Sequence, residues 1–150
     1  MGRELHARQA GLAPALRPEG VAGYTVVNLK TVEDQAPKFG FAPHMQSRFA
    51  RTALGLAGSG LSHFTLAPGF RVPFGHHHAG EEEVYVVVAG SARMKLDDEE
   101  VELGTWDAIR VAPTVTRGMQ GGPEGAEILA FGAPTDDRAD MAVVREFWPQ

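Results

Sequence analysis

Short apolar runs alternate with turn residues along the chain from residue 49 onward. Glycine, proline and aspartate separate these runs, and this arrangement is typical of an all-β sandwich or barrel. The run 84–89 is apolar at nearly every position, which indicates a strand that is covered on both faces. The predicted strands are Phe49–Leu56, Leu61–Ala67, Val84–Ala89, Ala92–Leu96, Val101–Leu103, Ala108–Val111 and Ile128–Phe131.

The N-terminal part of the chain is less clearly patterned. Residues 1–20 are rich in alanine, glycine and proline and are predicted to form an arm or loop, whereas Val21–Leu29 is apolar enough for an early strand. We therefore divide the chain into an arm with its early strand, a barrel, and a C-terminal helix or tail, with boundaries at residues 1–48, 49–134 and 135–150.

A short helix is predicted at the C-terminus. Thr135 or Asp136 can cap its first turn, and Met141, Val144 and Trp148 follow at spacings of three and four residues. Such a helix would bury one apolar stripe against the barrel, and we interpret the tryptophan as a packing residue.

Composition and charge exclude several classes of function. The chain has 150 residues, one domain's worth, and it has no cysteine, which excludes disulfides and thiolate metal sites. Its formal net charge is −5 and no basic cluster is present, so we expect no nucleic-acid partner. No apolar run is long enough to span a membrane and the first residues are charged, so we expect a cytoplasmic protein.

Three consecutive histidines carry the sharpest chemical signal. On a strand, His76 and His78 would point to one face and His77 to the other. A bend at Ala79-Gly80 would bring Glu83 onto the same face as His76 and His78. Two histidines and a carboxylate suit iron, and also zinc, manganese or nickel. The alternative is an exposed polar turn that binds nothing.

Other residues have weaker claims to a role. Tyr85 would share a face with Glu83, where it is either a pocket residue or a core aromatic. His63 is predicted to be a packed or surface histidine rather than a base or fourth ligand, and Met119 to form an apolar wall. The acidic run 97–100 is interpreted as a hairpin turn.

The chain resembles the cupin superfamily in two motifs. Residues 73–90, PFGHHHAGEEEVYVVVAG, are similar to the first cupin motif, with His76, His78, Glu83 and Gly90 at the family's spacing. Residues 104–117, GTWDAIRVAPTVTR, resemble the second motif, but Arg117 stands where the family usually has a fourth ligand histidine.

This resemblance extends over about residues 50–132. It implies a double-stranded β-helix, or jelly-roll barrel, of six to eight strands with the site inside. It also implies a homodimer, in some cupins formed by exchange of N-terminal strands.

The arginine at the second motif leaves three interpretations open. A metal ion held by His76, His78 and Glu83 could have Arg117 beside it to hold an anionic substrate. Alternatively, Arg117 replaces the ion and pairs with Glu83, because a guanidinium keeps its proton and cannot be a ligand. In the third interpretation Arg117 turns outward to solvent.

Two main functions follow from these interpretations. The first is a metal-dependent enzyme of oxygenase, isomerase or lyase type that acts on a small polar or acidic molecule, with Arg117 and Tyr85 as catalytic residues. The second is a metal-free cupin that binds a small ligand. A purely structural dimer is a third, weaker hypothesis.

Overall fold

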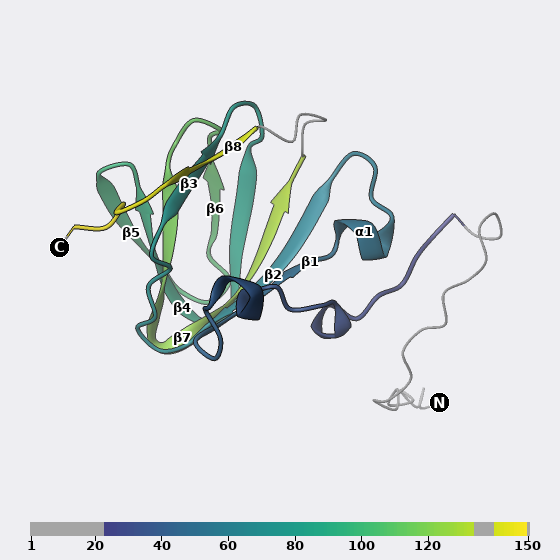
Figure 1. The fold of residues 1–150 in the computed structure, drawn as a ribbon, viewed down its shortest axis with the longest axis horizontal. Coiled ribbons are helices and arrows are strands. Elements are labelled where there is room, and N and C mark those ends of the chain that lie inside the picture. Colours follow the sequence, from purple (N-terminus) through teal and green to yellow (C-terminus); the bar gives the residue numbers. More distant parts are fainter. Residues whose placement is uncertain (1–22, 134–139, 150) are drawn as a thin grey trace, which may run out of the picture.

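The computed structural model describes residues 23–133 and 140–149, and almost all of its regular structure is β-strand (Figure 1). Two short 3-10 helices (η) and one single-turn α-helix lie before the second strand. The elements are η1 (Leu29–Thr31), η2 (Ala36–Phe39), β1 (Met45–Phe49), α1 (Arg51–Leu54), β2 (Gly60–Leu66), β3 (Gly75–His78), β4 (Glu83–Leu96), β5 (Glu99–Leu103), β6 (Ala108–Val111), β7 (Arg117–Gly132) and β8 (Met141–Val144).

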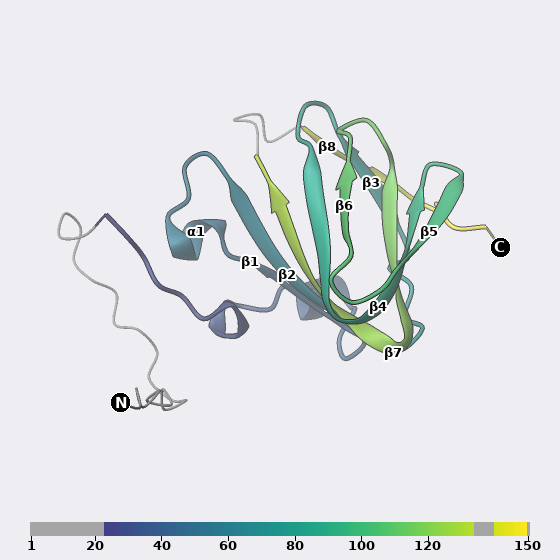
Figure 2. The same ribbon diagram turned by 180° about the vertical axis from the view of Figure 1, so that it is seen from behind.

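The strands form one antiparallel, eight-stranded sheet that curls around on itself (Figures 1 and 2). Along one path the strand order is β1-β2-β7-β3-β8, while β4 pairs with β7 and carries β5 and β6. The curled sheet confirms the prediction of an all-β jelly-roll barrel. Within the described residues, no helix is long and apolar enough to cross a lipid bilayer.

The two longest strands, β4 and β7, pair with each other and pass from one side of the barrel to the other. Their register shifts between Val87 and Ala89 and again between Gly90 and Ala92. The runs 84–89 and 92–96, predicted as separate strands, are therefore one strand with an irregularity between them. Glycine and proline also do not interrupt the chain at Gly121-Gly122-Pro123, ahead of the predicted strand Ile128–Phe131, because these residues lie inside β7.

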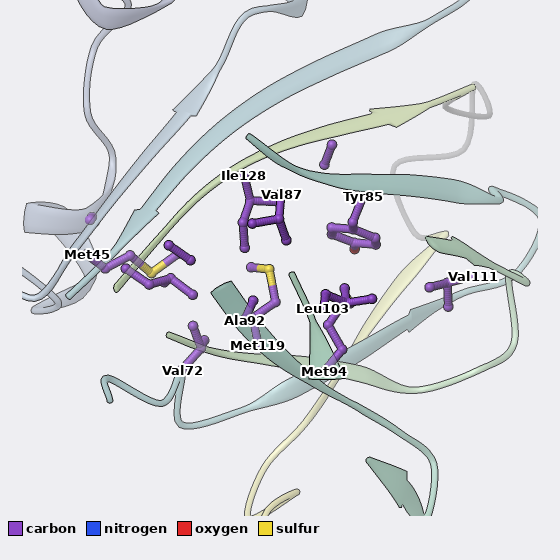
Figure 3. Close-up of a cluster of buried hydrophobic side chains, with 14 residues drawn as sticks. Met45, Val72, Tyr85, Val87, Ala92, Met94, Leu103, Val111, Met119 and Ile128 are labelled. Atoms are coloured by element: carbon purple, nitrogen blue, oxygen red, sulfur yellow. The ribbon is translucent and has the colours of Figure 1, made fainter. Parts of the chain in front are cut away.

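The core fills the space between the walls of the barrel. Val87 and Ile128 are almost completely buried and point toward Met119, as Figure 3 shows. Met94 and Leu103 approach from the part of the sheet made by the second half of β4 and by β5. One end of this interior is filled by apolar side chains, which leaves the other end to the histidines of β3.

Two predicted strands near the N-terminus are wrong. Instead of a strand over Phe49–Leu56, the chain forms α1, which ends at Gly55 in the left-handed region, with Leu56 N donating to the Arg51 carbonyl. The edge strand is β1, which begins earlier at Met45. Residues 23–28 form no strand, so the early strand predicted over Val21–Leu29 is absent from its described part.

The predicted C-terminal helix is also wrong over its described residues. Met141–Val144 is strand β8, which pairs antiparallel with β3 from Gly75 to His78. The free edge of β3 needs a partner for its backbone groups, and this tertiary demand outweighs the helical spacing of the apolar residues. Trp148 packs as expected: it is buried and its Nε1 donates to the Val72 carbonyl at 2.8 Å. The proposed cap residues Thr135 and Asp136 lie outside the described residues.

Gly90 offers a test of how tightly β4 and β7 approach each other. Its φ is +68°, and a Cβ atom there would lie 2.1 Å from the Gly125 carbonyl oxygen. We expect Gly90→Ala to lower the free energy of unfolding by about 3 kcal/mol, through backbone strain and steric overlap together. Urea denaturation measures the change.

Gly69→Ala is the matched control, because Gly69 has the same φ of +68° but no atom within 4 Å of an added Cβ. This variant should lose only about 1 kcal/mol, the cost of the backbone conformation alone. An equal decrease in the free energy of unfolding in the two variants would contradict the close approach of β4 and β7 at Gly90.

Candidate metal centre

Two histidines on β3 and one glutamate at the start of β4 converge inside the barrel. His76 and His78 alternate along β3 and share a face, with ring centroids 5.2 Å apart. The chain then bends at Ala79-Gly80 and returns as β4, which carries Glu83 back to them. The predicted change of direction at Ala79-Gly80 is confirmed.

Their ligand atoms lie close enough to share one ion. Glu83 Oε2 is 3.6 Å from His76 Nε2, and Glu83 Oε1 is 3.5 Å from His78 Nε2. One ligand atom from each of the three residues lies within 4.8 Å of the others. His77 does not join them, because its Nδ1 lies 3.5 Å from Thr116 Oγ1 and the residue is not part of the cavity lining.

Asp140 is a member of this site that the sequence did not reveal. Its Oδ2 is 3.1 Å from His78 Nδ1, and its Oδ1 accepts a hydrogen bond of 2.8 Å from the Gly80 backbone N–H. Burial alone would raise the pKa of this carboxyl, but the Gly80 hydrogen bond and His78 outweigh burial and lower it. No local motif marks this aspartate, which β8 delivers from 62 residues away.

The hydrogen bond to Asp140 determines which nitrogen of His78 is free. If the carboxylate accepts the proton of Nδ1, the lone pair of Nε2 points toward Glu83. This Nε2 atom is buried and has no hydrogen-bond partner. A lone pair facing a carboxylate without a proton or cation between them is unfavourable, so the donors present fit a divalent ion.

A second group of three donors shares the same histidine. His78 Nδ1, Glu81 and Asp140 also lie within one ion's reach. Both Asp140 oxygens already have partners there, and burial raises the pKa of the Glu81 carboxyl, which makes it a weaker anionic donor than Glu83. We therefore take this group as support for His78 and take His76, His78 and Glu83 as the candidate metal centre.

Arg117, the first residue of β7, is only 1% exposed, so the interpretation in which it turns to solvent is wrong. Its Nη1 donates to the carbonyls of Pro113 and Val115, and its Nη2 donates to that of Ala112. Its Nε lies 3.5 Å from Glu83 Oε2 and has no hydrogen-bond partner. The guanidinium therefore binds the loop before β7 and faces Glu83, an arrangement that does not favour its use as a clamp for an anionic substrate.

Glu83 is ionised at neutral pH despite its burial. Burial alone would raise its pKa, but interactions with His76, with the Tyr85 hydroxyl and with His78 together lower it below its ordinary value. The Tyr85 hydroxyl donates a hydrogen bond to Glu83 Oε2. Burial, reinforced by the neighbouring Glu83 carboxylate, raises the pKa of Tyr85 well above its ordinary range, so the phenol remains a donor.

Two other predictions about single residues are confirmed. His63 is 3% exposed and its Nε2 lies 2.8 Å from Glu127 Oε1, so it is a packed histidine away from the metal centre. Met119 is buried and forms part of the apolar wall beside Arg117.

A cavity of about 610 Å³ opens from this centre. The metal-centre residues, with Tyr85, Glu81 and Arg117, form its polar part. Most of the remaining lining is apolar and comes from η2, β1, β2 and β8. The volume lies within the range typical of small-molecule sites. The fold and site together define a β-barrel with a ligand cavity and a candidate two-histidine, one-carboxylate metal centre.

Comparisons with known proteins agree with this class. Residues 62–131 match the family model described as Cupin domain. This range contains the metal-centre residues and Arg117. This part of the chain is a small cupin domain. No curated protein matches the sequence at a significant level.

Solved structures with the same fold come from several bacteria. The polyketide cyclase RemF from Streptomyces resistomycificus is 23% identical with a TM-score of 0.65, over 84% of this chain and 87% of that one. A cupin protein from Bacteroides fragilis is 22% identical with a TM-score of 0.63, over 78% and 89% of the two chains. A sugar phosphate isomerase of the cupin superfamily from Silicibacter pomeroyi is 18% identical with a TM-score of 0.61, over 81% and 93%.

The buried cation can be tested by its effect on stability. Arg117→Met would remove the partner of Glu83 and leave three loop carbonyls without their donor. We expect the free energy of unfolding to fall by about 3–5 kcal/mol, as for other buried ion pairs that lose one member. Urea denaturation of the metal-free protein measures it.

The matched control is Arg93→Met, because the Arg93 side chain is 41% exposed and pairs with Glu102 at 2.6 Å on the surface. The free energy of unfolding of this variant should fall by less than about 1 kcal/mol. If the free energy of unfolding falls by the same small amount in both variants, Arg117 does not hold the loop and the carboxylate in place.

Proposed function

We propose that this protein binds a divalent transition metal through His76, His78 and Glu83 and acts on a small molecule held in the adjoining cavity. The observation that carries the proposal is the buried Nε2 of His78, which has no hydrogen-bond partner and lies 3.5 Å from Glu83. Iron, manganese, zinc and nickel all accept this donor set. The similar structures, at 18–23% identity, support the fold. They do not distinguish between oxygenase, isomerase and lyase reactions.

Such an ion, when bound, supplies a Lewis acid or, if it is redox-active, an oxygen-activating centre. The chain's own residues prepare the site. Asp140 holds the proton of His78 Nδ1, which leaves Nε2 free as a donor atom. Tyr85 donates to Glu83 and keeps its own proton, while Arg117 offsets part of the negative charge. The apolar lining places the polar end of the cavity next to a surface from which a bound apolar molecule would displace water.

A metal-free ligand-binding protein is the second candidate, and the position of Arg117 favours it. The guanidinium Nε already faces Glu83 at 3.5 Å, so the carboxylate has a permanent cationic neighbour without an ion. In that case, however, the buried Nε2 of His78 would still lack a hydrogen-bond partner, and this is why we prefer the metal-binding function.

Metal content decides between the two functions. Protein without an affinity tag, stripped with a chelator and reconstituted with iron, manganese, zinc or nickel, should retain close to one equivalent by elemental analysis. His76→Ala should abolish retention, whereas His77→Ala, the neighbouring histidine that lies outside the cavity lining, should leave it unchanged. We also expect chelation to lower the melting temperature of the wild type, because bound metal stabilises the folded state.

Less than about a tenth of an equivalent with every metal would reject the metal-binding function. Equal losses in the two histidine variants would show adventitious binding. A melting temperature insensitive to chelators, together with retained ligand binding, would support the metal-free alternative.

Asp140 provides a second prediction about the same centre. Asp140→Asn preserves the shape of the side chain and can still accept the Gly80 N–H, but its amide no longer orients His78 through a carboxylate. We expect the metal dissociation constant to rise about 10- to 100-fold, the usual effect of losing such a partner. Competition with a fluorescent chelator measures the affinity directly.

Glu82→Gln serves as the control, because Glu82 is exposed and pairs with Arg110 at 2.7 Å outside the site. Its metal affinity should equal that of the wild type. An unchanged affinity in Asp140→Asn would remove the positioning role, and loss of folding in the metal-free variant, seen by circular dichroism, would assign Asp140 a structural role instead.

A further inference from the structure

We infer that the ligand of the cavity is a neutral, largely apolar aromatic molecule with one oxygen function, a hydroxyl or carbonyl, at the end that meets the metal centre. This inference deepens the proposed function and rests on it for the role of that polar end. The apolar part of the argument depends on the lining alone. The inferred ligand therefore differs from the small polar or acidic molecule that the sequence suggested.

Phenylalanine is the most frequent residue type in the cavity lining. The chain has eight phenylalanines, and five of them line this one cavity, so aromatic surface is concentrated where a ligand would lie. The five are Phe39, Phe41, Phe49, Phe64 and Phe74. Aromatic rings prefer offset-stacked or edge-to-face neighbours, which a flat aromatic ligand supplies well.

These rings form two groups on different parts of the fold. Phe41 lies 6.0 Å from Phe74 and 6.4 Å from Phe39, measured between ring centroids. Phe49 on β1 and Phe64 on β2 meet edge to face at 6.2 Å. Phe39 and Phe49 are more than half exposed, although both line the cavity. Exposed aromatic surface of this kind is costly in water and is covered when an apolar ligand binds.

Polar groups are confined to one end. Apart from the metal-centre residues and the neighbouring Glu81, Tyr85 and Arg117, only Ser47 and Ser62 contribute polar side chains to the part of the lining that the structure describes. A sugar or another molecule with polar groups all round would leave most of them without hydrogen-bond partners against the phenylalanines. Each such unsatisfied group costs free energy, so the lining selects against highly polar ligands.

The charges at the polar end do not favour an anion. Glu81, Glu83 and Asp140 lie there with Arg117 as the only cationic side chain among the cavity-lining residues, and its Nη donors already bind backbone carbonyls. With the three carboxylates ionised, a divalent ion would bring the formal charge of this group to zero, not to a positive value. A neutral oxygen function therefore matches the site better than a carboxylate or phosphate.

Naphthol and naphthoate test the inference, because they share one aromatic skeleton and differ in charge at about pH 7. Isothermal titration calorimetry is carried out on chelator-stripped and on metal-loaded protein, with glucose as the polar comparison. We expect naphthol to bind both forms, naphthoate to bind the stripped form at least about tenfold more weakly, and glucose not to bind.

Two phenylalanine variants locate the binding. Phe49→Ala should weaken naphthol binding about fivefold or more, because it removes an aromatic wall at the cavity. Phe131→Ala is the matched control, since Phe131 is 44% exposed against 51% for Phe49 but does not line this cavity. Phe39→Ala is a second variant in case Phe49→Ala fails to fold.

The outcomes separate this inference from the proposed function. If metal binds but naphthol does not, or if naphthoate or glucose binds as well as naphthol, the substrate class is wrong while the metal centre stands. If naphthol binds and metal does not, the aromatic cavity stands and the metal-binding function fails. Light scattering would show whether the chain dimerises. If dimerisation abolishes naphthol binding in the calorimeter, a second copy of the chain covers the phenylalanines and the inference is overturned.

Discussion

A buried carboxylate is the constraint around which the site is organised. Glu83 must be ionised to serve as a ligand, yet burial of a charge is costly unless opposite charge or hydrogen bonds compensate it. Tyr85 and Arg117 are its fixed neighbours, one as hydrogen-bond donor and the other as cation. His76 and His78 lie on the remaining sides, where an ion would complete the compensation. The barrel positions these groups from three strands, β3, β4 and β7.

The part of this site that is local in sequence could be predicted. Alternation along a strand places His76 and His78 on one face, and a bend at Ala79-Gly80 is enough to return Glu83 to them. The all-β class followed from the spacing of apolar runs and turns, and the resemblance to cupins supplied the jelly-roll barrel. Predictions of this kind depend on stereochemistry within about ten residues, where the chain leaves few alternatives.

The rest depended on pairing between distant segments. The strand β8 replaced a predicted helix because the edge of β3 required a partner, which the spacing of Met141 and Val144 does not reveal. Asp140 came to the site only through that pairing. Arg117 could be recognised as a departure from the motif, but its direction depends on the carbonyls of the preceding loop. Rotamer choice and strand partners are tertiary properties, and the pattern of a single segment does not contain them.

The place of β8 in the chain has a consequence for how the protein is made. Asp140, directly before β8, is the neighbour of His78, and β8 itself supplies two cavity residues, Met141 and Val143, so both the wall and the site depend on this segment. Ribosomal synthesis delivers strands β1–β7 before this segment. A nascent chain that ends before residue 140 carries all three metal donors but holds His78 without its carboxylate partner. Formation of the candidate site is therefore coupled to synthesis and docking of β8, and His78 acquires its carboxylate partner only after that strand has paired with β3.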